Sequence, residues 1–299
     1  FSIFDRKKNK AFIVRDFYGI NPMFFKVTPD RFYFASEIKA LLETNRSSDL
    51  SLNKQGLFDF LTLAYIPGDM TPYNEISELH AGELVELDLD TGKFDKRKYY
   101  KIKFETDYSI TEKEASAKAY DLMYDSVRRN LIADKPVGTT LSGGVDTSTM
   151  VCLVKDMGKS ENFQTFSIKM AEKSFDESHY QQLVSKYAKT AHHEITVTAD
   201  DVIESMYEHM AHLDEPSGDG GAVPSFILAK RSKKYVDVLL SGEGGDEVFN
   251  AYSVHAAWKV KKYYTKYTPT FMRQFIYWMS HKMPANFEKL SLDFQMKRF

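Results

Sequence analysis

The sequence predicts an α+β domain over residues 1–104, followed by an α/β domain with a parallel sheet over residues 105–299. Three observations lead to this fold class. The chain has 299 residues, of which 43% are hydrophobic, so two domains can each bury a core. Short apolar segments broken by turn residues fill the first part, as in antiparallel strands. Strand-like and helix-like segments alternate in the second part, which is typical of a parallel sheet with helices on both faces.

In the first domain, short apolar and alternating segments define the expected elements. Strands are expected over 11–14, 31–35 and 82–89, and short helices over 37–43 and 54–62. Gly19, Asn21 and Pro22 supply turn chemistry after the first strand, and Asp90-Thr-Gly92 supplies a turn after the third.

The second domain is expected to begin with an amphipathic helix over 111–131, which carries acidic residues in its first turn and arginines in its last. Strands are then expected over 137–141, 164–168, 194–198 and 236–240, and helices after Asp146 and over 178–190, 200–213 and 222–235. In such sheets the active site lies at the carboxyl ends of the strands. Two glycine-rich loops follow predicted strands at that edge.

The first of these loops reads Leu141-Ser-Gly-Gly-Val-Asp-Thr-Ser148. A strand that runs into two glycines and then opens a helix presents backbone N–H groups to an anion such as a phosphate. Asp146 adds a carboxylate, which suits an anion site only if a cation accompanies the phosphates, and Mg²⁺ is the cation that this chemistry favours. The alternative is an ordinary strand-turn-helix corner, in which Ser142 or Asp146 caps the helix.

The second loop, Ser241-Gly-Glu-Gly-Gly-Asp-Glu247, follows the apolar run that ends at Leu240. Its carboxylates at Glu243, Asp246 and Glu247 repel one another unless a cation or a proton compensates. A helix start with acidic residues in its first turn is the alternative. The presence of two such loops in one sheet favours a shared site.

The motifs resemble those of a known family. The first loop is similar to the pyrophosphatase-type P-loop, Ser-Gly-Gly-x-Asp-Ser, with Thr147 in place of a serine. The glutamine-hydrolysing asparagine synthetases carry, in this order, motifs like 141–148, 166–168, 175–178, 192–194, 214–219 and 241–247, preceded by motifs like 15–22, 34–41 and 64–68. The resemblance implies an ATP pyrophosphatase (adenine nucleotide alpha hydrolase-like) domain, preceded by part of an N-terminal-nucleophile glutaminase domain.

The resemblance also implies a reaction. ATP adenylates a carboxylate and releases pyrophosphate, and glutamine-derived ammonia then displaces AMP to give an amide. It implies that pyrophosphate binds Ser142, Gly143, Gly144, Thr147 and Ser148, that Asp146 and Asp246 hold Mg²⁺, and that adenosine lies near Leu141, Ile168, Ser241 and Gly242. Glu243 is the expected general base. Aspartate is the expected acceptor carboxylate, with residues 214–224 shaping its pocket; sugar acids and peptides stay open, whereas Glu243 in place of tyrosine disfavours a β-lactam precursor.

The same resemblance implies that the chain lacks the N-terminal catalytic cysteine of the glutaminase domain and a later catalytic lysine. We therefore expect no glutamine hydrolysis by the 299 residues alone. One rival interpretation is an ATP-using enzyme that modifies a tRNA base or a nucleotide. Another is a catalytically silent fragment that binds ATP or a partner subunit.

The composition of the chain limits which classes of partner it is expected to bind. The net charge is −2 and the lysines are scattered, which argues against nucleic acid, and no apolar run is long enough for a membrane span. The family implies small-molecule substrates and a cytoplasmic enzyme, and a homodimer stays open. The single cysteine, Cys152, is expected in the core rather than as a nucleophile.

Three further motifs favour structural roles. His192 and His193 are adjacent at a strand start and therefore point to opposite faces, which disfavours a shared metal ion. Residues 175–178 read as a helix start near the nucleotide, capped by Asp176 or Ser178. In the tail, 252–299, aromatic residues and lysines at helical spacing favour a packing face over a nucleic-acid surface.

Overall fold

The structure, a computed structural model, describes residues 1–44, 50–170 and 176–282. The chain divides into two compact units. Unit 1 comprises Phe1–Ser109 together with Ser205–Val223, and unit 2 comprises Ile110–Glu204 together with the chain from Pro224 onward. The predicted boundary between residues 104 and 105 stays a prediction. Over the described residues, every helix is too short or too polar to cross a membrane.

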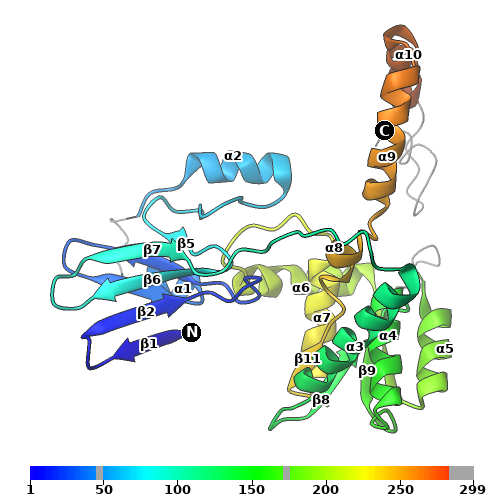
Figure 1. The fold of residues 1–299 in the computed structure, drawn as a ribbon, viewed down its shortest axis with the longest axis horizontal. Helices are drawn as coiled ribbons and strands as arrows, with labels where there is room; N and C mark the ends of the chain where they lie inside the picture. Colours follow the sequence, from blue (N-terminus) through cyan, green and yellow to red (C-terminus); the bar gives the residue numbers. More distant parts are fainter. Residues whose placement is uncertain (45–49, 171–175, 283–299) are drawn as a thin grey trace. The chain divides into compact units, whose positions relative to one another are not determined.

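Unit 1 contains two antiparallel sheets (Figure 1). The first has the order β1-β2-β6-β7 and consists of Ser2–Asp5, Lys10–Val14, Glu83–Asp88 and Phe94–Lys98. The second has the order β4-β3-β5 and consists of Phe32–Ala35, Phe24–Val27 and Ser77–Glu78. Ile13 and Val85 from the first sheet and Phe25 from the second form one buried cluster with Leu79. The two sheets therefore share a core.

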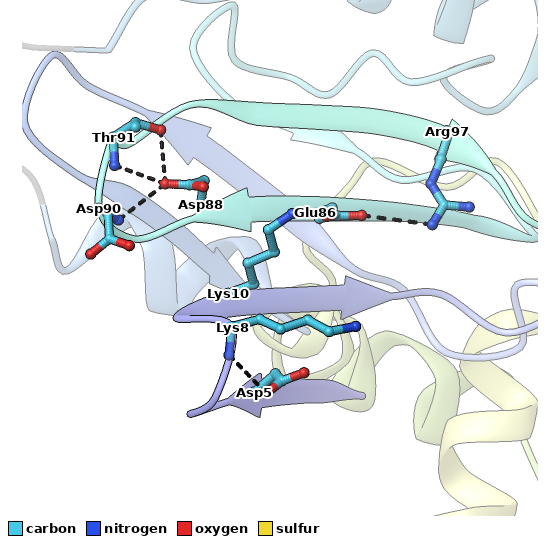
Figure 2. Close-up of polar contacts among 8 residues, drawn as sticks. All are labelled: Asp5, Lys8, Lys10, Glu86, Asp88, Asp90, Thr91 and Arg97. Atoms are coloured by element: carbon cyan, nitrogen blue, oxygen red, sulfur yellow. Dashed lines mark hydrogen bonds and ion pairs between the residues drawn. The ribbon is translucent and has the colours of Figure 1, made fainter.

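Polar contacts fix the register of the first sheet (Figure 2). Glu86 on β6 lies between Lys10 on β2, at 2.6 Å, and Arg97 on β7, at 3.7 Å, so one carboxylate links three neighbouring strands. At the end of β6, Asp88 accepts hydrogen bonds from the backbone N–H groups of Asp90 and Thr91. This closes the predicted turn between β6 and β7.

Unit 1 contains α1, Ile38–Leu42, and α2, Lys54–Leu63, which confirms both predicted helices, and it also contains residues 205–212 of α6, Ala199–His212. The predicted strands over 11–14, 31–35 and 82–89 are likewise present as β2, β4 and β6. The sequence did not predict β1, β3, β5 or β7. β7 reads Phe-Asp-Lys-Arg-Lys and is exposed along its length, so no apolar alternation marks it as a strand.

Unit 2 begins with α3, Glu112–Asn130. Thr111 and Glu114 form a capping box at its start, since each side chain accepts a hydrogen bond from the backbone N–H of the other. The basic last turn holds Arg128 and Arg129, as the sequence predicted.

A four-stranded parallel sheet with the order β10-β9-β8-β11 follows, and it confirms the predicted α/β fold. Its strands are β8 Val137–Thr140, β9 Gln164–Met170, β10 Ala191–Val197 and β11 Val238–Leu240. The helices that follow are α4 Val145–Asp156, α5 Ser178–Ala188, α6 Ala199–His212, α7 Ala222–Ser232, α8 Gly245–Phe249, α9 Ser253–Tyr267 and α10 Thr270–Lys282. The expected helical, aromatic tail is present to residue 282, and the remainder lies outside the described residues.

Helices cover both faces of this sheet, as predicted. On one face Val151 of α4 and Ala188 of α5 pack with Leu141 at the end of β8. On the other face Leu228 of α7 packs with Phe166 of β9 and Val236. The sheet grows outward from β8: β9 and β10 lie on one side, and β11 lies on the other. The strand order therefore reverses between β8 and β11, and the crevice of such a fold lies at this switch point.

Candidate active site

The first loop, Leu141–Ser148, connects β8 to α4. Gly143 has a φ of +87°, which favours glycine, and Gly144 is the N-cap residue of α4 and has no side chain to cap the helix. The hydroxyl of Thr147 accepts a hydrogen bond from the Ser142 backbone N–H at 3.1 Å and lies 2.9 Å from the Ser142 hydroxyl. The side chains of Ser142 and Thr147 thus hold the first loop in place, although neither caps α4.

Ser148 lies in the first turn of α4. Its hydroxyl oxygen is buried, and the described residues offer it no hydrogen-bond partner. A native structure seldom leaves a buried hydroxyl unsatisfied, except where a ligand or water binds. Together with the positive end of a 12-residue helix, this hydroxyl suits an anion at the mouth of the first loop.

The second loop, Ser241–Glu247, lies directly against the first. β11 pairs in parallel with β8, and the Thr139 hydroxyl donates to the Leu240 carbonyl at 3.2 Å. A β-carbon on Gly242 would lie 3.1 Å from the side chains of both Asp146 and Thr147. A β-carbon on Gly245 would lie 2.6 Å from the Asp146 carboxyl carbon. The structure therefore brings the two predicted loops into contact at the switch point.

Carboxylates of both loops affect the pKa of the same phenol, that of Tyr252. The Tyr252 hydroxyl donates a 2.6 Å hydrogen bond to Glu247, and this bond raises the pKa of the phenol to about 12. Burial adds to the rise, and so do the negative charges of Glu247, Asp246 and Asp146. Asp146 and Asp246 come from different loops, and the negative charge of each acts on Tyr252. Glu243 is exposed on the second loop.

The predicted metal ligands, Asp146 and Asp246, are two carboxylates, one from each loop. Over the described part of the chain, no three histidine, cysteine or acidic side chains gather as a metal site. Two carboxylates completed by phosphate oxygens are the environment that Mg²⁺ favours, since it keeps few protein ligands. Asp146 and Asp246 fit that donor set.

The predicted adenosine residues lie around the ends of the central strands. Leu141 is fully buried, and its backbone N–H donates to the Phe166 carbonyl at 2.7 Å. Ile168 is partly buried near the end of β9, whereas Ser241 is exposed after β11. The sequence did not predict Gln181 of α5, which hydrogen-bonds the carbonyls of both Ser142 and Ile168. A lone glutamine in an amphipathic helix gives no sequence signal.

The two adjacent histidines have the structural surroundings that their position predicted. His192 lies between the hydroxyls of Thr165, at 2.9 Å, and Ser167, at 3.1 Å, and burial lowers its pKa. His193 stacks on Phe166, and its ring also packs at a tilt against the ring of Tyr235. The two rings therefore lie on opposite faces of β10.

Two minor predictions need adjustment. Cys152 of α4 is half-buried rather than fully in the core, and burial raises the pKa of its thiol, which disfavours the reactive thiolate. α5 begins at Ser178, whose N–H donates to the Asp176 carboxylate at 3.0 Å, although the N-cap position itself belongs to Glu177. Phe175 of that motif lies outside the described residues.

Residues 214–223 belong to unit 1. Asp214 accepts a hydrogen bond from the Lys39 backbone N–H, and it pairs with the Lys39 ammonium at 3.2 Å. The Gly218 N–H donates to the Ala64 carbonyl at 2.9 Å. The predicted role of this segment in an acceptor pocket stays a prediction.

The parallel sheet, with helices on both faces and paired glycine loops at the ends of β8 and β11, defines unit 2 as an α/β domain. Residues 118–297 match the family model described as asparagine synthase, and residues 1–100 match that of a glutamine amidotransferase domain. The chain belongs to the asparagine synthase family.

Several known proteins are similar to the chain. It is 35% identical to the putative asparagine synthetase [glutamine-hydrolyzing] 2 of Methanocaldococcus jannaschii, over 85% of this chain and 49% of that protein. It is 28% identical to asparagine synthetase [glutamine-hydrolyzing] 1 of Bacillus subtilis, over 85% of this chain and 39% of that protein. The chain thus spans half or less of the length of these relatives. Among solved structures, the NH3-dependent NAD synthetase from Campylobacter jejuni has a TM-score of 0.32 and 13% sequence identity. The match covers 46% of this chain and 60% of the synthetase chain.

Proposed function

We propose that the protein carrying this chain is a glutamine-dependent amidotransferase, which uses ATP to convert a carboxylate, most simply aspartate, into its amide. The contact between the two loops carries the proposal, because it places the Asp146 carboxylate against Gly245 at the switch point of the sheet. Membership of the asparagine synthase family supports the reaction type. The expected partners are small molecules, and the expected location is the cytoplasm.

In the first step, a carboxylate oxygen of the acceptor attacks the α-phosphorus of ATP. An acyl-adenylate forms, and the bond to the β-phosphate breaks to release pyrophosphate. Charge then develops on the leaving oxygens, which is where preorganised donors stabilise a transition state most. The first loop supplies such donors from Ser142, Gly143, Gly144, Thr147 and Ser148, of which Ser148 has a buried hydroxyl still to be satisfied.

Mg²⁺ belongs to this proposal. When bound, it would neutralise charge on the phosphates. Asp146 and Asp246 are the residues that would hold it, one from each loop. Leu141, Ile168, Ser241 and Gly242 would surround the adenosine, since they lie at the ends of β8, β9 and β11.

In the second step, ammonia attacks the acyl carbon and AMP leaves with the bonding electron pair. The attacking nitrogen must lose a proton, and Glu243 is the proposed base. Its exposed position on the second loop leaves its carboxylate accessible to a substrate.

Two alternative functions are distinguished from the proposed amidotransferase by experiment. An enzyme of the same family could amidate a different carboxylate, such as a sugar acid or a peptide. A catalytically silent, ATP-binding protein is the second candidate.

Product analysis with a panel of carboxylates separates these functions. We expect the intact protein to release pyrophosphate from ATP only when the right carboxylate is present, with aspartate tested first. Another active carboxylate would correct the substrate alone. Release of inorganic phosphate would contradict the mechanism, and ATP binding without turnover on any carboxylate would support the silent protein.

A further inference from the structure

Gln181 is a buried amide that joins the ends of two parallel strands. It lies on α5 and is 2% exposed. Its Nε2 donates to the carbonyl of Ser142, which follows β8, and to the carbonyl of Ile168 on β9, each at 3.2 Å. One side chain thus links the first loop to the neighbouring strand.

Stability alone gives little reason for an amide at this position. Its Oε1 is buried, and no residue that the structure describes offers it a donor. An unsatisfied buried acceptor costs about as much as the two Nε2 hydrogen bonds contribute. A methionine or leucine would fill the same space without the unpaired Oε1, but it would take the Nε2 donor away from the Ser142 and Ile168 carbonyls. The hydrogen bonds from Nε2 therefore point to a role in placing the two carbonyls.

The rest of the α5 N-terminus packs on the same loop. A β-carbon on Gly143 would lie 3.0 Å from Tyr180 Cβ, 3.3 Å from the Glu177 carbonyl oxygen and 3.4 Å from Gln181 Cγ. Gly143 also has a φ of +87°. The first loop thus rests on α5 with no space for a side chain, and Gln181 fixes its carbonyl side.

We propose that Gln181 is a positioning residue for ATP, which sets the spacing between the phosphate-binding first loop and the adenosine-binding end of β9. It acts through Ser142 and Ile168 and does not itself contact the reacting atoms. This inference rests on the proposed function, in which Ser142 binds the phosphates and Ile168 lies beside the adenosine. ATP has to span both points, so a change in their spacing weakens its binding.

The neighbouring residue provides a matched control. Gln182 is the same residue type on the same helix, but it is exposed and its Nε2 donates to Glu194 at 2.5 Å. The test compares Gln181→Met with Gln182→Met in the intact protein, by steady-state kinetics with ATP and the active carboxylate. Gln181→Met should raise the KM for ATP about tenfold, because the misplaced carbonyls no longer hold the first loop and β9 at the spacing that ATP needs. The KM for the carboxylate should stay within twofold, and Gln182→Met should match the wild type in both.

Melting temperatures without ATP show whether a variant is folded. An unchanged KM for ATP in folded Gln181→Met overturns the inference, as does an equal rise in the KM of both substrates. If Gln181→Met does not fold, Gln181→Asn replaces it, because the shorter side chain keeps the amide but cannot reach both carbonyls; the same two results decide. A wild-type protein that neither binds nor turns over ATP would contradict the proposed function instead.

Discussion

The carboxylate of Asp146 lies directly against the α-carbon of Gly245, where a β-carbon would come within 2.6 Å of the carboxyl carbon. Asp146 belongs to the first loop and Gly245 to the second. Gly242 makes a similar approach to Thr147, so two glycines allow the loops to meet. The glycines of the second loop therefore serve the contact between the loops as well as their own turn.

We expect Gly245→Ala to displace the Asp146 carboxylate and to lower ATP turnover at least tenfold. The physical reason is steric, because a 2.6 Å approach between carbon atoms forces the Asp146 side chain to move away from its place between the loops. Pyrophosphate release under saturating carboxylate measures the effect.

Gly158→Ala is the control for Gly245→Ala. Gly158 lies just beyond the other end of α4, with a φ of +69° and nothing within 4 Å of its missing β-carbon. Its substitution should lower the melting temperature through backbone strain while turnover is retained. Equal turnover in Gly245→Ala and the wild type would show that the loop contact is dispensable.

The two loop aspartates provide a second prediction. Asp146→Asn and Asp246→Asn keep the shape of the side chain but remove its charge, so each should abolish turnover while the melting temperature without ligand stays close to that of the wild type. Loss of negative charge should also weaken the dependence of ATP binding on Mg²⁺. Magnesium titrations at fixed ATP test this. Normal turnover in either variant would exclude that residue as a metal ligand.

Much of this fold could be predicted from the sequence because its signals are local. A few neighbouring residues are enough to recognise the capping box at Thr111 and Glu114, the two glycine loops and the apolar strands. The order of the strands around β8 was not predicted, but the carboxyl ends of parallel strands lie at one edge of the sheet. The contact between the two loops was expected for that reason, without any knowledge of side-chain positions.

Other features depend on residues far apart in the chain. Gln181 donates to Ser142 across 39 positions, and Asp214 pairs with Lys39 across 175 positions. No periodicity or spacing encodes such pairs. β7 was missed for a different reason, since an exposed edge strand has no buried face to produce alternation.

The capping box of α3 allows a prediction about stability. Thr111→Ala removes the side-chain acceptor of the Glu114 N–H, and it also frees the Glu114 carboxylate from the Thr111 hydroxyl at 2.7 Å. Loss of such a cap costs about 1 kcal/mol, so unfolding of unit 2 should begin at a lower temperature. Scanning calorimetry measures the change. Thr149→Ala on α4, whose hydroxyl only bonds back to the Val145 carbonyl, should change stability less.

The last prediction concerns Glu215, a carboxyl group of unit 1 that lies close to Glu78, Asp214 and Arg15. Burial raises its pKa to about 7, and the negative charges of Glu78 and Asp214 add to the rise, while Arg15 opposes it. Burial also raises the pKa of Glu78, although Arg15 lies 2.8 Å from it. The folded state therefore binds protons more tightly than the unfolded chain, where a glutamate has a pKa of about 4.3.

The sign of the pH dependence follows from this. Between pH 4.3 and 7, roughly, the folded state carries more protons than the unfolded state, so stability falls as the pH rises through this window. Glu215→Gln should therefore be more stable than the wild type at pH 8, by about 1 kcal/mol once solvent screening of a half-exposed group is allowed for, and equal to it near pH 4. Thermal unfolding of both proteins from pH 4 to 8 measures the difference.

Glu75→Gln is the control with the opposite sign. Hydrogen bonds from the Ser51 backbone and hydroxyl lower the pKa of Glu75, so its charge stabilises the folded state at neutral pH. That variant should be less stable than the wild type above the normal glutamate pKa, and the difference should shrink as the pH falls below that value. The stability of Glu215→Gln and of the wild type could instead change with pH in the same way. In that case the Glu215 carboxyl is charged in the folded protein, and Arg15 compensates its charge.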